Sequence, residues 1–192
     1  KLYIDVKDEH LKRMLWLIAP VLIGVAVNQI NTIVDRTIAS TLVEGSISAL
    51  NYATKLNQFV MGMFIVSISS VVYPMLSKLS TENNKEKFNK SIITSVNTVT
   101  LLVIPISIGA IILANPIVKL LFQRGEFDVR ATQMTAVALI FYSIGMIGYG
   151  LRDILGKVFY SLQDTRTPMI NGVIAMVLNI TLNILFVKYT NM

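Results

Sequence analysis

The stretch MLWLIAPVLIGVAVNQINTIVDRTIAS, residues 14–40, decides the fold. It is longer than the roughly 20 residues that an α-helix needs to cross a ~30 Å hydrocarbon layer. Four polar side chains of its second half share one helical face, at the spacing i, i+3, i+4 and i+7: Asn28, Asn31, Thr32 and Asp35. Polar groups at membrane depth face a bundle interior or a watery cavity by default. The stretch therefore predicts a membrane helix with one polar face.

A second polar face follows in the next apolar segment, where Asn51, Lys55 and Gln58 share a helical stripe. Lys55 lies about 13 Å along its helix, at ~1.5 Å per residue, which is too deep for easy snorkelling. Two polar faces on consecutive membrane helices predict the lining of a cavity. The predicted lining residues are Asn28, Asn31, Asp35, Asn51 and Gln58.

The whole chain has the composition of a membrane protein. Of its 192 residues, 54% are hydrophobic and 15% are charged, whereas a soluble domain has about 25% charged residues. The span lengths disfavour the alternative, a soluble all-α core. We expect an all-α integral membrane protein whose single lobe covers residues 14–188, preceded by a cytoplasmic lead-in at 1–13 and followed by a truncated end at 189–192. Its spans are predicted at about 14–40, 47–79, 91–114, 129–163 and 169–187.

The distribution of Lys and Arg predicts the topology, because cytoplasmic loops carry the excess of positive charge. The larger set falls on one side: Lys1, Lys7, Lys12, Arg13, Lys78, Lys85, Lys87, Lys90, Arg152, Lys157 and Arg166. The smaller set falls on the other: Lys119, Arg124, Arg130 and Lys188. The amino end is therefore predicted to be cytoplasmic. The same rule accounts for the net charge of +6 without a nucleic-acid partner.

Lys55 is the strongest candidate for function, because a buried ammonium needs an anion. The anion is either a protein carboxylate, with Asp35 as the candidate, or an anionic ligand, and a ligand that displaces the carboxylate reconciles the two. Asp35 and Arg36 alternatively lie at the outer headgroup level, and Asp35 is alternatively a proton or sodium site. The side-chain amides of Asn28, Gln29 and Asn31 alternatively join helices by hydrogen bonds worth about 0.6 kcal/mol each.

Glycine and proline residues inside the spans are predicted to mark bends in the helices. Proline and clustered glycine interrupt or loosen membrane helices, and repeats in transporters rock about such points. Glycines close together in a membrane helix alternatively mark a close-packing point. The predicted hinge residues are Pro20, Gly24, Pro105, Gly145, Gly148 and Gly150.

Enzymatic chemistry has little support in this sequence. The chain has no cysteine, and its one histidine, His10, lies in the polar lead-in. Thiolate chemistry, a Ser-His triad and a His-based metal site are therefore not indicated. No glycine-rich phosphate loop follows a strand. We predict no cofactor and no metal, and leave open a coupling to the membrane potential or to a monovalent cation.

Several stretches resemble one family, the MurJ/MviN-type lipid II flippases. They are QINTIVDRTIASTL (29–42), ALNYATKL (49–56), LFQRGEF (121–127) and FYSLQDTRTP (159–168), and their order and spacing match over nearly the whole chain. The resemblance implies a fold of two six-helix lobes within the multidrug/oligosaccharidyl-lipid/polysaccharide exporter superfamily. This chain is then most of the second lobe, and the first lobe is missing.

The resemblance also implies an activity and a role for Lys55. Members of this family move an undecaprenyl-diphosphate-linked peptidoglycan precursor across the bacterial cytoplasmic membrane by alternating access. Cationic residues of the central cavity hold the diphosphate, and Lys55 stands where the family commonly has arginine. Arg36 is the second candidate for the diphosphate. Lysine is a point charge, whereas arginine grips two phosphate oxygens in a fixed fork.

The predicted function is therefore a lipid II flippase, a transporter and not an enzyme, with membrane lipids and the diphosphate-linked precursor as partners. A sister exporter of another lipid-linked polysaccharide or of drugs is the nearest alternative, although a cationic drug favours an acidic cavity. A non-transporting membrane scaffold is the alternative from a different class. A scaffold tolerates apolar replacement of Asn28, Asp35 and Lys55 together, whereas a transporter does not.

Overall fold

The computed structural model describes residues 9–82 and 84–190 and is all-α over these residues. The helices that begin the chain are α1 (Glu9–Ala39), α2 (Ser46–Val60), the π-helix η1 (Met61–Val66) and α3 (Ser67–Thr81). They are followed by α4 (Lys85–Ile112), α5 (Ala114–Phe122), α6 (Val129–Ser161) and α7 (Arg166–Thr190). Most of the expected lead-in, 1–8, and the final 191–192 lie outside the described residues.

The prediction of an all-α protein with five membrane-length helices is confirmed for the described residues. The helical stretches long and apolar enough to cross a membrane are Met14–Ala39, Ser46–Thr81, Lys85–Ile112, Val129–Ser161 and Arg166–Phe186. Most of their ends differ from the expected ones by no more than three residues, close to the usual uncertainty of helix boundaries. The third helix begins at Lys85, six residues before the expected 91, because the side chain of Asn84 caps it. The second stretch combines α2, η1 and α3.

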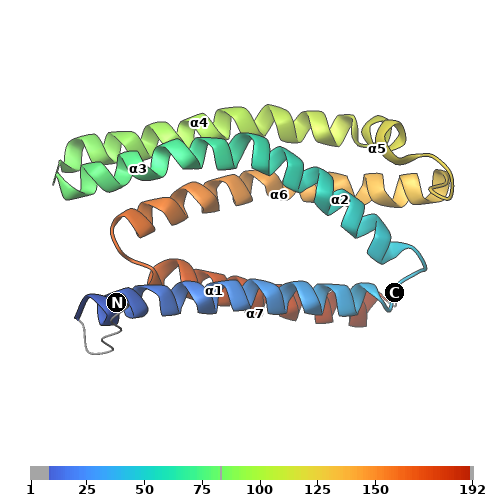
Figure 1. Cartoon of the computed structure of the whole chain (residues 1–192). Coiled ribbons are helices and arrows are strands. Elements are labelled where there is room, and N and C mark those ends of the chain that lie inside the picture. Colours follow the sequence, from blue (N-terminus) through green and yellow to red (C-terminus); the bar gives the residue numbers. More distant parts are fainter. Residues whose placement is uncertain (1–8, 83, 191–192) are drawn as a thin grey trace, which may run out of the picture. The chain divides into compact units, whose positions relative to one another are not determined.

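The chain divides into two compact units. Unit 1 comprises 1–41 and 162–192, and unit 2 comprises 42–161. In unit 1, α1 and α7 pack along each other (Figure 1). The guanidinium of Arg166, at the start of α7, lies 4.1 Å from the centre of the Trp16 ring. The two helices expose most of their apolar side chains, as expected of surfaces that meet lipid or further protein.

In unit 2, α6 is the central element and contacts α2, η1, α3, α4 and α5. Figure 1 shows α3 and α4 running side by side along much of their length. Three apolar clusters follow α6 from end to end, and each takes a residue from it. They centre on Leu139 with Ala53, on Met146 and Ile154 with Val99, and on Val158 with Leu76.

Serine hydroxyls join the helices of unit 2 across these clusters. The Oγ of buried Ser107 on α4 donates to the carbonyl of Ser143 on α6. The Oγ of Ser80 on α3 donates to the carbonyl of Ser161 at 2.9 Å. The Oγ of Ser69 donates to the carboxylate of Asp153. Small polar side chains of this kind let membrane helices approach closely and bind through hydrogen bonds.

Asparagine or aspartate precedes three of the helices, because its side-chain oxygen accepts hydrogen bonds from the free N–H groups of the first turn. The Asn84 Oδ1 accepts from the Lys87 N–H at 3.1 Å, and the Asp128 Oδ1 accepts from the Ala131 N–H at 2.7 Å. Asp164 Oδ1 accepts from the N–H groups of Arg166 and Thr167, each at 3.0 Å. These residues place the turns that separate α3 from α4, α5 from α6 and α6 from α7.

Two features of the helices were not expected from the sequence. The second span contains the π-helical turn Met61–Val66, which holds one extra residue per turn and is common near functional sites. The third span ends at Ile112, two residues before the expected 114, and the separate helix α5 follows, with Pro116 inside its first turn. A proline is tolerated there because the first N–H groups of a helix have no intrahelical partner.

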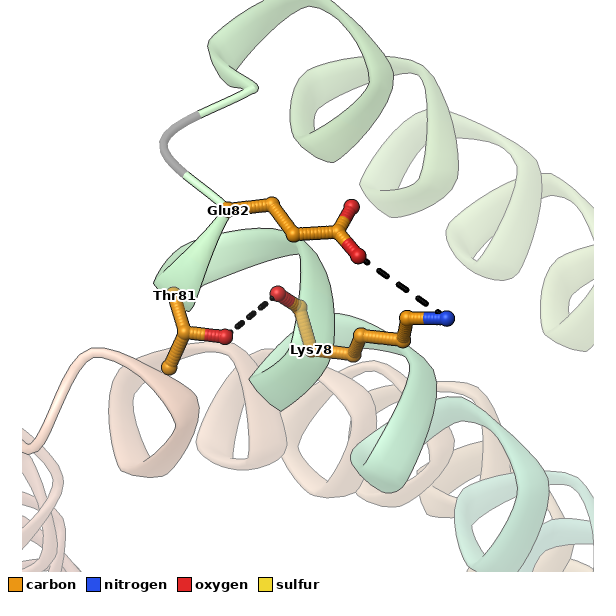
Figure 2. A network of polar contacts seen from close by, with 3 residues as sticks. All are labelled: Lys78, Thr81 and Glu82. Atoms are coloured by element: carbon orange, nitrogen blue, oxygen red, sulfur yellow. Dashed lines mark hydrogen bonds and ion pairs between the residues drawn. The ribbon is translucent and has the colours of Figure 1, made fainter.

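The last turn of α3 is polar and solvent-accessible. The Lys78 Nζ lies 3.8 Å from Oε1 of Glu82, and Thr81 Oγ1 donates to the Lys78 carbonyl at 2.7 Å (Figure 2). The side chains of Lys78 and Glu82 are 77% and 49% exposed, so this pair contributes at most about 1 kcal/mol. The turn marks where the second span leaves the apolar part of unit 2.

Candidate functional site

The polar face predicted on the second span lies on the exposed side of α2. Ala53 and Asn57 form the buried stripe of this helix, at 0% and 7% exposure. Asn51, Lys55 and Gln58 are all exposed, on the opposite side. The structure therefore brings the three predicted residues together on a surface of unit 2 that its own core does not cover.

The ammonium of Lys55 lies beside an aromatic cluster that consists of Tyr52, Phe122 and Phe127. The Lys55 Nζ is 5.5 Å from the centre of the Tyr52 ring. That ring is 4.8 Å from Phe122 and 5.1 Å from Phe127, the second contact being edge-on at 87°. The rings of the two phenylalanines are 5.9 Å apart. These spacings and tilts are those that aromatic pairs prefer.

The segment between α5 and α6 is folded so that it returns Phe127 to this cluster. Gly125 adopts a φ of +58°, which favours glycine. The Phe127 N–H donates to the Arg124 carbonyl at 3.1 Å and closes the turn. Asp128 then begins α6 through its bond to the Ala131 N–H. The motif LFQRGEF therefore meets the motif ALNYATKL in space.

The polar face of α1 makes a hydrogen-bonded network with α7. The Asp35 Oδ2 accepts from Asn31 Nδ2 at 3.1 Å, and its Oδ1 accepts from Asn183 Nδ2 at 2.7 Å. Asn183 Nδ2 also lies 2.9 Å from Oδ1 of Asn179, one turn earlier on α7. Asp35 and Asn31 are half-buried. Amides from two helices thus satisfy a carboxylate inside a membrane span.

The other polar residues predicted on α1 are exposed. Asn28 and Arg36 both lie on the open surface of unit 1. Asp35 and Arg36 belong to unit 1, whereas Lys55 belongs to unit 2. The pairing of Lys55 with Asp35 stays a prediction, as does the cavity between the two polar faces.

The predicted hinge residues all lie inside continuous helices. Pro20 and Gly24 are in α1, Pro105 is in α4, and the glycine cluster is in α6. A Cβ placed on Gly150 would lie 2.9 Å from Val99 Cγ1 and 3.0 Å from Ile65 Cδ1, whereas one on Gly148 meets nothing within 4 Å. Gly150 is thus a point of close helix packing. The hinge roles of these residues stay predictions.

Residue patterns alone did not single out the aromatic cluster or the amides of α7. Tyr52 sits within the second polar stretch, and Phe122 and Phe127 flank the turn, so their aromatic character was the available signal. Asn179 and Asn183 share a face at i and i+4 in an apolar segment. That pattern, in a membrane helix, marks a partner on a neighbouring helix.

The fold and these surfaces define a multi-pass, all-α membrane protein with a lysine on one exposed polar face and an amide-bound carboxylate in a second helix pair. A family model described as "Lipid II flippase MurJ" matches residues 1–192. The chain therefore belongs to the lipid II flippase MurJ family, and the resemblance noted from its motifs is confirmed.

Similar proteins have the same description. A "Probable lipid II flippase MurJ" from Vibrio cholerae is 38% identical over 180 residues, which cover 94% of this chain and 34% of the relative. One from Haemophilus influenzae is 35% identical over 190 residues, 96% of this chain and 37% of the relative. The chain spans about a third of the length of these curated relatives.

A solved structure is similar in fold to this chain. It is titled "Lipid II flippase MurJ, inward closed conformation", and it matches with a TM-score of 0.80 at 35% identity. The match covers 98% of this chain and 40% of that chain. The fold of the matched part is therefore that of a solved member of the family.

Proposed function

We propose that this chain is part of a lipid II flippase of the bacterial cytoplasmic membrane, with its amino end on the cytoplasmic side. The full-length protein moves an undecaprenyl-diphosphate-linked precursor across that membrane by alternating access. The family match over residues 1–192 is the observation that carries this proposal. The chain supplies most of the second lobe, and the first lobe comes from the remainder of the full-length protein.

In this proposal Lys55 binds the diphosphate, and Arg36 assists it. Lys55 is exposed on a polar face of a membrane span, and a cation at that depth needs an anion. A diphosphate supplies several strong acceptor oxygens for the ammonium. A cationic drug has the opposite charge, so the exposed Lys55 favours a lipid-linked diphosphate over a drug.

Complementation tests the function. The full-length wild-type protein is expressed in cells depleted of their own lipid II flippase, beside Lys55→Gln, Lys55→Arg and Lys119→Gln. We expect rescue by the wild type and by Lys55→Arg, which keeps the charge. We expect Lys55→Gln to fail, because losing a charge-assisted hydrogen bond of about 1.5–3 kcal/mol weakens binding by roughly 10- to 150-fold.

The Lys119→Gln variant is the matched control. Lys119 is an exposed lysine on α5, outside the polar face of α2, so its loss of charge should leave rescue intact. A membrane-inserted wild type that does not rescue would contradict the flippase proposal. Rescue by Lys55→Gln at wild-type level would remove Lys55 from the mechanism and leave the transport function standing.

A further inference from the structure

Among the described residues of unit 2, the ring of Tyr52 lies beside the ammonium of Lys55, and Phe122 and Phe127 in turn contact that ring. No carboxylate of the described part of unit 2 lies within ion-pair distance of the ammonium. The Tyr52 ring lies 5.5 Å from it, within the ≈6 Å range over which a ring face attracts a cation. The contact thus directs an exposed, flexible side chain without neutralising it.

We propose that Tyr52, held by Phe122 and Phe127, is a positioning residue that orients Lys55 to bind the diphosphate. This inference rests on the proposed function. A lysine head is a compact charge on a four-carbon stem that loses considerable rotamer entropy when it binds. A ring that already favours one orientation of the stem reduces that cost, which is the advantage of preorganisation.

A ring suits this role better than a carboxylate does. A carboxylate beside Lys55 accepts its N–H donors and competes with the phosphate oxygens for them. The π-face of tyrosine attracts the charge but leaves the ammonium's strong hydrogen bonds for the ligand. Lys55 is also exposed beside the ring, so an anion can approach it from outside unit 2.

The Tyr52 ring is itself fixed by contacts far along the chain. Helical spacing of i and i+3 brings Tyr52 and Lys55 to neighbouring positions on α2, but it does not hold the ring in place. The rings of Phe122, at the end of α5, and Phe127, after the Gly125 turn, contact it, with their centres 4.8 and 5.1 Å from its own. The buried Ala53 anchors this turn of α2 against α6.

A double-mutant cycle between Tyr52 and Lys55 tests the proposal. The full-length protein is placed in nanodiscs as wild type, Tyr52→Leu, Lys55→Met and the double variant. The affinity for undecaprenyl diphosphate is measured in each, with undecaprenol as the uncharged control lipid. We expect Tyr52→Leu to weaken diphosphate binding by about two- to fivefold, from the size of a cation–π contact at an exposed site. In the Lys55→Met protein, Tyr52→Leu should change nothing further.

Companion variants separate positioning from folding. Tyr52→Phe keeps the ring and should bind diphosphate as the wild type does, whereas Phe127→Leu loosens the ring and should cause a smaller, Lys55-dependent loss. Phe141→Leu, an exposed aromatic change elsewhere on α6, should leave binding unchanged. If Tyr52→Leu does not fold, the Phe127→Leu cycle decides, and an unchanged affinity there overturns the proposal.

The outcomes distinguish this inference from the proposed function. If Tyr52→Leu weakens diphosphate binding equally in the wild-type and Lys55→Met backgrounds, the ring has a purely structural role. That result overturns this inference and leaves the proposed function standing. A loss from Tyr52→Phe as large as that from Tyr52→Leu assigns the effect to the hydroxyl and also overturns it. Undiminished diphosphate binding by Lys55→Met overturns both the inference and the role of Lys55 in the proposed function.

Discussion

At the scale of single residues, polar side chains have different roles according to which face of a helix carries them. On α2, Asn57 is buried against the core of unit 2, whereas Lys55 is exposed. On α1, Asp35 is satisfied by amides of Asn31 and Asn183. An unpaired charge in an apolar layer is costly, so the carboxylate's two amide partners give it a stable place in the α1–α7 pair.

Asp164 gives a residue-scale prediction about pH. The hydroxyl of Thr167 donates to its Oδ2 at 2.6 Å, and this bond, followed by the N–H bonds to Oδ1, holds the pKa of Asp164 below its ordinary value. A carboxylate with a lowered pKa stabilises the folded state above its unfolded pKa, near 3.9. The contribution is lost as pH falls through the lower folded pKa. Asp164→Ala should cost about 1 kcal/mol at neutral pH.

The check is thermal unfolding of the full-length protein in detergent, as wild type, Asp164→Ala and Asp164→Asn. Asparagine keeps an acceptor for the two N–H groups, so Asp164→Asn should lose less stability at neutral pH than Asp164→Ala. The difference in unfolding temperature between wild type and Asp164→Ala should shrink as the pH is lowered below about 4. A difference that grows in acid would contradict the stated direction of the pKa.

At the scale of elements, α6 organises unit 2. It contributes to each apolar cluster and receives hydrogen bonds from α3 and α4 through Ser80 and Ser107. Its glycines are not equivalent, because Gly150 faces the side chains of α4 and η1 while Gly148 is exposed. Close packing at one point and open surface two residues away are both consequences of helical periodicity.

A pair of glycine substitutions tests this view of α6. Gly150→Ala places a Cβ 2.9 Å from Val99 Cγ1 and 3.0 Å from Ile65 Cδ1, so the helices must separate or the side chains must shift. Overpacking of this kind costs about 1–3 kcal/mol. Gly148→Ala, with nothing within 4 Å, should leave stability unchanged or raise it slightly. Unfolding midpoints of the two full-length variants in detergent check the contrast, and equal midpoints would count against the packing role.

At the scale of the whole molecule, the distribution of charge and the five membrane-length helices found among the described residues predict a topology that labelling can test. The chain contains no cysteine. Once any cysteines in the rest of the full-length protein are replaced, labelling of a single introduced cysteine shows on which side of the membrane that residue lies. Glu82, after α3, is predicted to be cytoplasmic, and Glu126, between α5 and α6, is predicted to lie outside. Both side chains are exposed.

The topology prediction uses Glu82→Cys and Glu126→Cys in spheroplasts, with a membrane-impermeant maleimide. We expect Glu126→Cys to be labelled in intact spheroplasts, because its turn should face outward. Glu82→Cys should be labelled only after lysis. The reverse pattern would show that the chain is inserted with the opposite orientation, and labelling of both in intact spheroplasts would contradict the assignment of α4 as a span.

Amino-acid sequence by itself determined the fold class, the helices long enough to cross a membrane and the polar faces on two of them. These properties are local, because hydropathy over a span and a 3.6-residue period do not depend on distant parts of the chain. The family could also be predicted, because the motifs that carry it are continuous stretches. The π-helical turn in the second span could not, since no proline or cap marks it.

Only the tertiary structure decided which faces meet. Asp35 and Asn183 are 148 positions apart, and the Tyr52 ring meets Phe127 only because the Gly125 turn folds back toward α2. Gly150 became distinct from Gly148 only when α4 and η1 were packed against it. Each of these contacts depends on how separate helices are rotated and docked against one another. That information comes from packing between helices, and no single stretch of sequence contains it.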